Sequence, residues 1–391
     1  MLRSTDRIRT SHAGALEQPE SLREFIKKRD EGQPYDQAAF DTELRAAVAA
    51  VVKRQSECGL DSLCDGEFGK QNFTSYVGTR ISGYQPKVLD PATAPSSSAS
   101  VRRDATEFPG YYNRRGDTLF GRGTSSQRTR ITCTGPLRYT GQQAIGHEIE
   151  IFRQALNGLS YEEAFLPAAG PGILSSTTMN EYYRNEEEFV WAIADAMQNE
   201  YKAIVDAGFL LQIDDPHLLM GWQQEPEMNV RDYQRYTAVR VEAINHALRG
   251  ISPGSVRLHT CWGSWLGPHT ADLPLKDIVE VLLQINVGVL SIEASNPRHE
   301  HEWRVWEDVK LPDGKMLMPG VVGHFGDFVE HPELIADRLV RYARLVGREN
   351  VIAGTDCGLR RVGHPEIAWA KFRAMAEGAR IASKRLWGHE Q

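Results

Sequence analysis

The feature that most constrains the fold is a repeated alternation between short apolar runs and longer amphipathic stretches. In residues 185–207, for example, Phe189, Ile193, Met197 and Ile204 recur close to helical spacing. Several of the short runs are almost continuously apolar, as expected of parallel strands that are buried on both faces. Repeated strand–helix units of this kind predict an α/β fold with a parallel sheet.

The number of strand candidates favours a closed (β/α)8 TIM barrel over an open doubly wound sheet. The eight candidates are Arg7–Ala15, Leu60–Glu67, Ala164–Gly172, Phe209–Asp215, Ser255–Cys261, Val287–Glu293, Met316–Val322 and Val351–Cys357. Helices are predicted over Gln142–Leu156, Asn185–Ala207, Val230–Leu248, Leu275–Gln284, Pro332–Val346 and Pro365–Ile381. No G-x-G-x-x-G motif opens a helix after the first strand, which counts against a dinucleotide-binding fold.

Composition narrows the class of protein. The chain has 391 residues, 41% of them hydrophobic, which is enough to bury a single large core, so one domain over 1–391 is expected. The net charge of −7 argues against nucleic acid as a partner. No apolar run is long enough to span a bilayer and Met1–Thr10 does not resemble a signal peptide, so a cytoplasmic location without membrane contact is expected. The chain has five cysteines, an odd number, which indicates reduced thiols and not a framework of disulfides. A homo-oligomer is compatible with the sequence.

The segment 85–130 breaks the alternation. It is rich in proline, serine, arginine and glycine. A long irregular segment inside a compact domain is usually functional or disordered. We predict an insertion over the barrel mouth that serves as a lid or a subunit contact, with a disordered surface loop as the equal alternative.

Four residues at the ends of three predicted strands have side chains that can bind a metal. His259 and Cys261 are two apart on one strand and therefore point the same way. Glu293 and Cys357 end two other strands, and the carboxyl ends of barrel strands meet at the mouth. A single such cysteine is more often a core residue, and a single glutamate a helix cap. Together, however, the two thiolates, the imidazole and the carboxylate predict a tetrahedral Zn²⁺ site. The other cysteines, Cys58, Cys64 and Cys133, lack this context and are assigned to packing.

The pattern resembles the C-terminal catalytic half of cobalamin-independent methionine synthase, and above all its short single-barrel relatives, a group that includes epoxyalkane:coenzyme M transferase. The segment 211–216 (LQIDDP) resembles the family's Q-I-D-E-P strand end, and 65–68 (DGEF) resembles its G-E strand end. The segment 10–15 (TSHAGA) resembles the N-terminal G-S segment, and 354–359 (GTDCGL) the D-C-G-L zinc segment. The resemblance covers most of the chain outside 85–130.

This resemblance implies a zinc-dependent methyl- or alkyltransferase in which zinc holds the incoming thiol as a thiolate, the form that a cation favours. It implies that Glu293 is the ligand that moves aside when the thiol binds. Glu67 and Asp214 match positions that hold the amino group of homocysteine, and Asp214 is also predicted to be a catalytic residue. His12 lies in the G-S segment, and we predict that it contacts the substrate. An ion-pair network at the mouth is the alternative for the two carboxylates.

Three departures from the family bear on the substrates. Ala15 stands where the family has a serine that contacts an amino-acid carboxylate. The segment 170–176 lacks the tryptophan that stacks on folate in the family. We predict that Trp262 contacts the substrate with its aromatic ring, with simple packing as the alternative. The half of methionine synthase that helps hold the folate tail has no counterpart, so folate is not the expected donor. Phe325 occupies the position of the family's acid–base histidine. We predict that His324, one residue earlier, is the general acid; the alternative is a histidine that only forms a hydrogen bond at the rim of the barrel.

Three classes of function are compatible with these residues. The first is alkyl transfer to a zinc-bound small-molecule thiol, with a methylated cofactor, an aryl methyl ether, an epoxide or a corrinoid-bound methyl group as donor. The second is a metal-free lyase of the uroporphyrinogen decarboxylase type, against which the four-residue metal set argues. The third is a non-catalytic protein with structural zinc. Structural zinc sites usually clamp short loops, so a site spread over three strands argues against it.

Overall fold

The structure, a computed structural model, describes residues 1–89, 100–115 and 129–388. Eight parallel strands form one sheet in the order β1-β11-β10-β9-β8-β7-β5-β2. Their bounds are β1 (Arg9–Thr10), β2 (Ser62–Leu63), β5 (Glu163–Ala169), β7 (Leu210–Asp214), β8 (Val256–Thr260), β9 (Val289–Glu293), β10 (Met316–Val322) and β11 (Ile352–Thr355). The Asp61 amide donates to the Thr10 carbonyl at 3.2 Å, which brings the β1 and β2 ends of the sheet together. The predicted (β/α)8 barrel is therefore confirmed.

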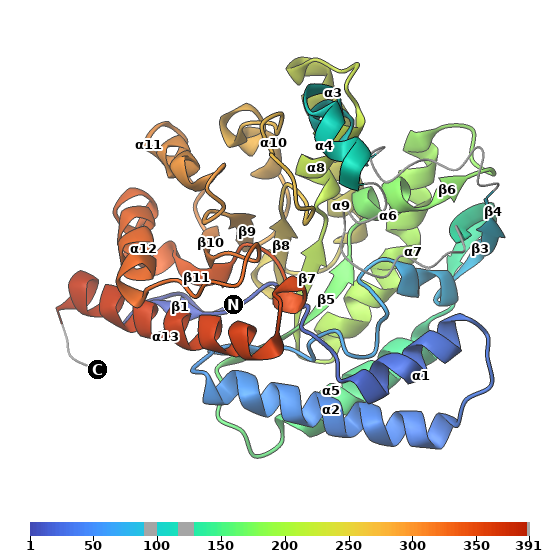
Figure 1. Cartoon of the computed structure of the whole chain (residues 1–391), viewed down its shortest axis with the longest axis horizontal. Coiled ribbons are helices and arrows are strands. Elements are labelled where there is room, and N and C mark those ends of the chain that lie inside the picture. The colour runs from blue at the N-terminus through green and yellow to red at the C-terminus, as the bar shows by residue number, and fades with distance from the viewer. Residues whose placement is uncertain (90–99, 116–128, 389–391) are drawn as a thin grey trace.

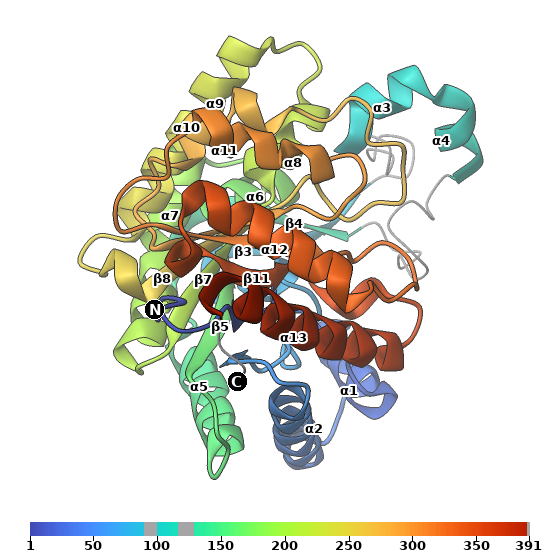
Figure 2. The same ribbon diagram turned by 90° about the vertical axis from the view of Figure 1, so that its left-hand side faces the viewer.

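Helices surround this sheet, and the longest of them cover its outside (Figures 1 and 2). They are α1 (Glu20–Asp30), α2 (Gln37–Glu57), α5 (Gln142–Leu156), α6 (Pro171–Thr177), α7 (Glu186–Asp206), α8 (His217–Gln224), α9 (Val230–Ala247), α10 (Val279–Leu282), α11 (Val305–Asp308), α12 (Pro332–Val346) and α13 (Pro365–Trp387). Helix α7 illustrates why they form: Asn185 caps the Glu188 amide, and the apolar stripe that begins at Phe189 is buried. Among the described residues, no helix combines the length and apolar character that crossing a membrane requires.

Several strands are shorter than the sequence predicts. The predicted strand Arg7–Ala15 contributes only β1, because the chain turns away after Thr10 and Gly14 adopts a φ of 109°. Cys261 follows the last residue of β8, and Cys357 lies beyond the end of β11. The two cysteines therefore stand on the first residues of the mouth loops and not on the strands themselves.

The segment 85–130 contains more regular structure than predicted. A second sheet in the order β3-β4-β6 includes both of its ends, and two short helices lie between them. The bounds are β3 (Ile81–Val88), α3 (Arg102–Glu107), α4 (Pro109–Arg115), β4 (Thr129–Tyr139) and β6 (Met179–Asn180). The long-range pairing of β3 with β4 explains why local composition suggested a loop. Residues 90–99 and 116–128 lie outside the described residues.

A polar layer fills the barrel beneath the mouth. Arg257 is 2% exposed and donates to the Gln212 side chain at 2.8 Å, to the Ser11 hydroxyl at 2.7 Å and to the His12 carbonyl at 2.8 Å. Gln212 in turn donates to Asp214 Oδ1 at 2.7 Å. Because a buried polar group without a partner is costly, this chain of bonds fixes the position of Asp214 at the end of β7.

Candidate metal centre

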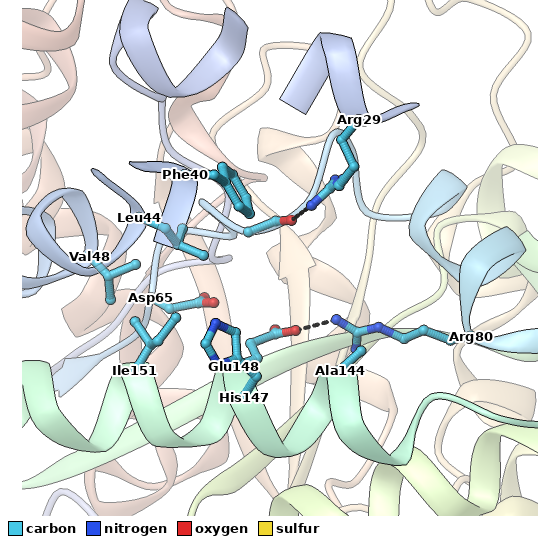
Figure 3. Close-up of a pocket in the computed structure, with 11 residues that line it drawn as sticks. Arg29, Phe40, Leu44, Val48, Asp65, Arg80, Ala144, His147, Glu148 and Ile151 are labelled. Atoms are coloured by element: carbon cyan, nitrogen blue, oxygen red, sulfur yellow. Dashed lines mark hydrogen bonds and ion pairs between the residues drawn. The ribbon is translucent and has the colours of Figure 1, made fainter. Parts of the chain in front are cut away.

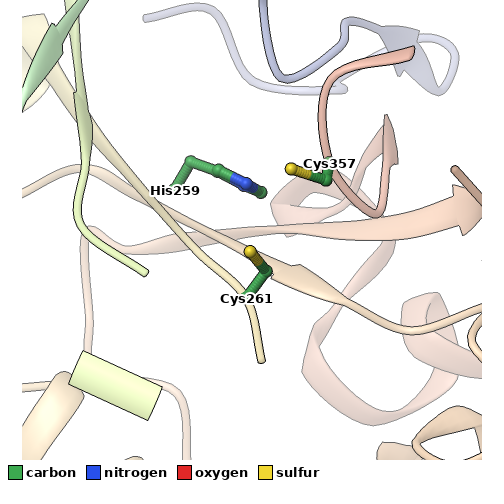
Figure 4. A group of neighbouring side chains, drawn as sticks. All are labelled: His259, Cys261 and Cys357. Atoms are coloured by element: carbon green, nitrogen blue, oxygen red, sulfur yellow. The ribbon is translucent and has the colours of Figure 1, made fainter. Parts of the chain in front are cut away.

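Three of the predicted metal ligands converge at the carboxyl ends of β8 and β11. The ligand atoms of His259, Cys261 and Cys357 all lie within 4.8 Å of one another, and the three side chains point toward a common centre (Figure 4). His259 and Cys261 are buried and Cys357 is half-buried. A cluster of one imidazole and two sulfurs of this size matches the donor set of a tetrahedral zinc site.

The imidazole of His259 is oriented for such a role. Its Nδ1 lies 3.3 Å from the Ser291 hydroxyl on the neighbouring strand β9. Its Nε2 is buried and has no hydrogen-bond partner within the part of the chain that the structure describes. Burying a polar atom unpaired is unfavourable, and metal-binding histidines typically direct one nitrogen to the ion and hold the other with a hydrogen bond. The His259 geometry fits a metal ligand.

The two cysteines form an unequal pair. A hydrogen bond from the Cys261 thiol and the nearby imidazole of His259 hold the pKa of Cys357 well below its usual range, against the opposing effect of burial. The same bond to Cys357, together with burial, raises the pKa of Cys261. The Ser264 hydroxyl also donates to Cys357 Sγ at 3.4 Å. Cys357 is therefore the sulfur that carries negative charge most readily, as a metal-binding thiolate requires.

Glu293 lies next to this cluster but is grouped with other residues. Its Oε2 accepts from the Trp262 amide at 2.8 Å, whereas its buried Oε1 has no hydrogen-bond partner among the described residues. Its ligand atoms fall in a second group, with His324 and Asp356. Burial, and the nearby charge of Asp356, raise the pKa of Glu293. Two sulfurs, an imidazole nitrogen and this unpaired carboxylate oxygen are together chemically suited to zinc.

Glu67, four residues beyond the end of β2, and Asp214, the last residue of β7, are both buried carboxylates. Burial raises the pKa of Glu67 to about 7, and Asp65 adds to this rise against the effect of Lys70. Burial and the nearby Glu67 charge likewise raise the pKa of Asp214. Two such groups favour a cationic ligand, because a cation between them would stabilise both charged forms.

The two residues predicted to contact the substrate, His12 and Trp262, lie in packed surroundings. The His12 ring is 1% exposed, its Nε2 lies 2.9 Å from Gln55 Oε1, and it packs against Phe165 and Phe372. Trp262 is 1% exposed, stacks on His299 with ring centres 3.6 Å apart, and donates to a backbone carbonyl. This geometry of Trp262 agrees with the packing alternative, because neither its ring nor its N–H faces open space.

His324 lies inside the site. Its side chain is fully buried, Nδ1 is 3.9 Å from Glu293 Oε1, and neither ring nitrogen has a hydrogen-bond partner in the described ranges. Burial lowers its pKa to about 4, so the imidazole is neutral near pH 7. A neutral imidazole is able to accept a proton and to release it again.

The sequence reasoning missed two residues that contact the candidate metal ligands. Ser291 lies two positions before Glu293 on β9, and the alternation of strand side chains was a signal that would have found it. Ser264 lies in the irregular loop after β8, where no periodicity exists to place its side chain. Its contact with Cys357 is visible only in the folded chain.

A cavity of about 120 Å³ lies apart from these residues, between α1, α2 and α5 (Figure 3). Phe40, Leu44 and Val48 form an apolar wall, and Asp65 and the ion pair of Arg80 with Glu148 lie opposite. None of the predicted metal ligands lines it, so the cavity is separate from the metal centre.

The chain is similar to known methionine synthases in sequence and in fold. Methionine synthases of Thermococcus kodakarensis and Saccharolobus solfataricus are 24% and 25% identical to this chain, each over 96% of it and over 94% and 95% of their own lengths. The solved structure of a B12-independent methionine synthase from Shewanella sp. W3-18-1 shares the fold, with a TM-score of 0.71 and 19% identity over 98% of this chain and 100% of its own. The putative vitamin-B12 independent methionine synthase from Listeria monocytogenes does so at a TM-score of 0.66 and 17% identity, with both chains fully covered.

The model of one family, described as the catalytic domain of cobalamin-independent synthase, matches residues 168–381. This match spans more than half of the chain and includes β7 to β11, the strands whose ends surround the metal centre. The chain therefore belongs to the cobalamin-independent synthase catalytic-domain family.

Proposed function

We propose that the chain is a zinc-dependent methyl- or alkyltransferase whose acceptor is a small-molecule thiol. The observation that carries this proposal is the convergence of His259, Cys261 and Cys357 within 4.8 Å, next to a Glu293 oxygen without a hydrogen-bond partner among the described residues. A zinc ion bound there would stabilise the thiolate form of the acceptor, which is its nucleophilic form. Within this proposal the whole chain acts as one catalytic domain, and the described parts of 85–130 border its mouth.

The first candidate acceptor is homocysteine. The relatives named above are methionine synthases, and methionine is homocysteine methylated on sulfur. The carboxylates of Glu67 and Asp214 are suited to the amino group of this acceptor, because a bound ammonium would offset the burial and repulsion that raise both pKa values. Asp214 is held in place for this role by Gln212.

The proposed transfer forms one bond to the alkyl carbon and breaks one bond to it. The acceptor sulfur attacks the alkyl carbon, and the bond between that carbon and the donor breaks, with its electron pair leaving on the donor. In this proposal the His324 imidazole, whose ring nitrogens have no hydrogen-bond partner among the described residues, carries the thiol proton to the departing donor. The burial of His324 supports this role, because it keeps bulk water from competing for the proton.

The second candidate is the opening of an epoxide by a thiol of the coenzyme M type. Ala15 favours it, because an alanine has no hydroxyl for the carboxylate of an amino-acid acceptor. The Ala15 methyl group lies so close to Gly358 that a Cβ added there would come within 2.7 Å of it. The absence of a tryptophan from 170–176 likewise favours a donor other than folate.

Metal analysis tests the zinc. Purified wild-type protein is expected to hold about one zinc ion per chain. Cys261→Ser is expected to lose it, whereas Cys133→Ser, a buried cysteine outside the cluster, is expected to keep it. An active wild-type enzyme without metal would contradict the proposal and favour a metal-free lyase.

Binding experiments test the acceptor. Asp214→Asn and Glu67→Gln are expected to weaken homocysteine binding by about tenfold or more, because each removes one charge-assisted contact to the ammonium. Binding of 2-mercaptoethanesulfonate, which has no amino group, is expected to change little and serves as the matched control. Equal effects on both thiols would contradict the role of the two carboxylates, and zinc X-ray absorption that shows no new sulfur neighbour with any thiol would contradict direct thiol binding.

A further inference from the structure

The loop that follows β8 lies between the metal centre on one side and the α3–α4 segment, residues 102–115, on the other. On the metal side, the Ser264 hydroxyl donates to Cys357 Sγ at 3.4 Å. The Ser264 carbonyl accepts from the Arg361 guanidinium at 2.6 Å, and Arg361 lies four positions beyond Cys357. Ser264 is therefore tied twice to the turn that carries the metal-binding cysteine.

The next residue of the loop is tied to the α3–α4 segment. Trp265 is fully buried, and its indole donates to the Tyr112 hydroxyl of α4 at 3.2 Å. Trp265 and Tyr112 form a small apolar cluster of their own with Val101, separate from the barrel core. In Figure 1, α3 and α4 lie beside α8, away from the helices around β1 and β11. Because Ser264 and Trp265 are adjacent, a shift of the indole would move the hydroxyl that faces Cys357.

Asp104 of α3 holds the far end of the same loop. It is fully buried and accepts from the His269 amide at 2.9 Å, from the Ala271 amide at 3.0 Å and from the Tyr112 hydroxyl at 3.2 Å. Charge-assisted bonds of this kind are stronger than neutral ones. His269 has a φ of 57°, which residues other than glycine rarely adopt, so this turn depends on the contacts that surround it.

We infer that Asp104 and Tyr112 are positioning residues that hold the loop 261–271 in the conformation in which Ser264 donates to Cys357. The inference rests on the proposed function, because it concerns the same metal centre. Hydrogen bonds to metal ligands orient them and tune their basicity, and their removal typically lowers metal affinity by about 10–100-fold. The α3–α4 segment thus acts on the metal centre through the loop.

Cobalt(II) binding tests this inference, because cobalt(II) is a spectroscopic probe of the metal site. The variants are Ser264→Ala, Tyr112→Phe and Asp104→Asn. Thr106→Ala is the matched control, since the Thr106 hydroxyl donates to the Arg102 carbonyl within α3. The measurements are the dissociation constant, by competition with a chelator, and the thiolate-to-cobalt absorption band. Ser264→Ala is expected to weaken binding by about tenfold and to shift the band. Tyr112→Phe and Asp104→Asn are expected to act in the same direction, and Thr106→Ala to change neither.

The double variant Tyr112→Phe/Ser264→Ala decides whether the two positions act together. If Tyr112 acts through Ser264, the double variant binds cobalt no more weakly than Ser264→Ala alone. Multiplied effects would overturn the inference, as would wild-type affinity in all single variants of a protein that binds cobalt, and both results would leave the proposed function standing. A wild-type protein that binds no cobalt would overturn the inference together with the proposed function. Should Asp104→Asn fail to fold, Tyr112→Phe, which keeps the ring, decides alone.

Discussion

Replacing Lys371 by methionine removes one partner of an ion pair buried between α13 and the turn after β10. Lys371 Nζ lies 2.9 Å from Glu330 Oε2, and the two side chains are 0% and 3% exposed. The other oxygen of Glu330 accepts from the Gly323 amide at 2.7 Å, one residue before His324. Methionine keeps most of the apolar stem of lysine, so the main change is a buried carboxylate that has lost its cation.

The structure sets the size of the expected effect. At 2.9 Å and an effective dielectric constant of about 20, the attraction between the two charges is about 6 kcal/mol, which desolvation of both groups offsets in part. Breaking one partner of a buried pair typically costs about 3–5 kcal/mol, because the remaining charge stays buried. We expect Lys371→Met to lower the free energy of unfolding by about 3–5 kcal/mol.

Urea denaturation measures this loss. The matched control is Lys53→Met, which breaks the 3.7 Å pair with Glu57, two side chains that are 67% and 60% exposed, and is expected to cost about 0.5 kcal/mol or less. Lys371→Met/Glu330→Gln is expected to recover part of the stability, because the glutamine is neutral and still accepts from the Gly323 amide. A loss below about 1 kcal/mol in Lys371→Met, or a double variant less stable than Lys371→Met, would refute the reasoning.

Two further predictions concern the surroundings of the site. Burial alone would lower the pKa of His299, but hydrogen bonds to Asp272 and Glu302 raise it to about 9. His299 therefore contributes up to about 3 kcal/mol of stability below about pH 6.5, and this contribution is lost as the pH rises through about 9. Urea unfolding of wild type and His299→Gln across this window should show the difference shrinking, and a constant difference would argue against the raised pKa. Gly170→Ala would place a Cβ well inside van der Waals distance of a carboxylate oxygen of the buried Asp215 and should cost about 1–3 kcal/mol, so thermal unfolding at the wild-type temperature would contradict this close approach of Asp215 to Gly170.

The barrel, and the closeness of three of the four candidate metal ligands, were open to prediction because their signals are local. A parallel strand that is buried on both faces appears in the sequence as a run of consecutive apolar residues. Met316–Val322 was predicted in this way with its observed bounds. Once a chain is seen to alternate strands and helices in this way, the right-handed crossover places every strand's carboxyl end at one rim. His259, Cys261 and Cys357 were therefore expected at the same rim, and the structure brings their ligand atoms within 4.8 Å of one another.

Only the tertiary structure determined the contacts between segments that have no periodic sequence pattern. The pairing of β3 with β4, the packing of α3 against the loop after β8 and the burial of Trp262 against His299 all join residues remote in sequence. The direction of an irregular loop depends on which distant groups satisfy its backbone, as Asp104 does for His269 and Ala271. Local periodicity specifies elements and their exposed faces, whereas loop geometry is set by long-range hydrogen bonds and packing, which exist only once the chain has folded.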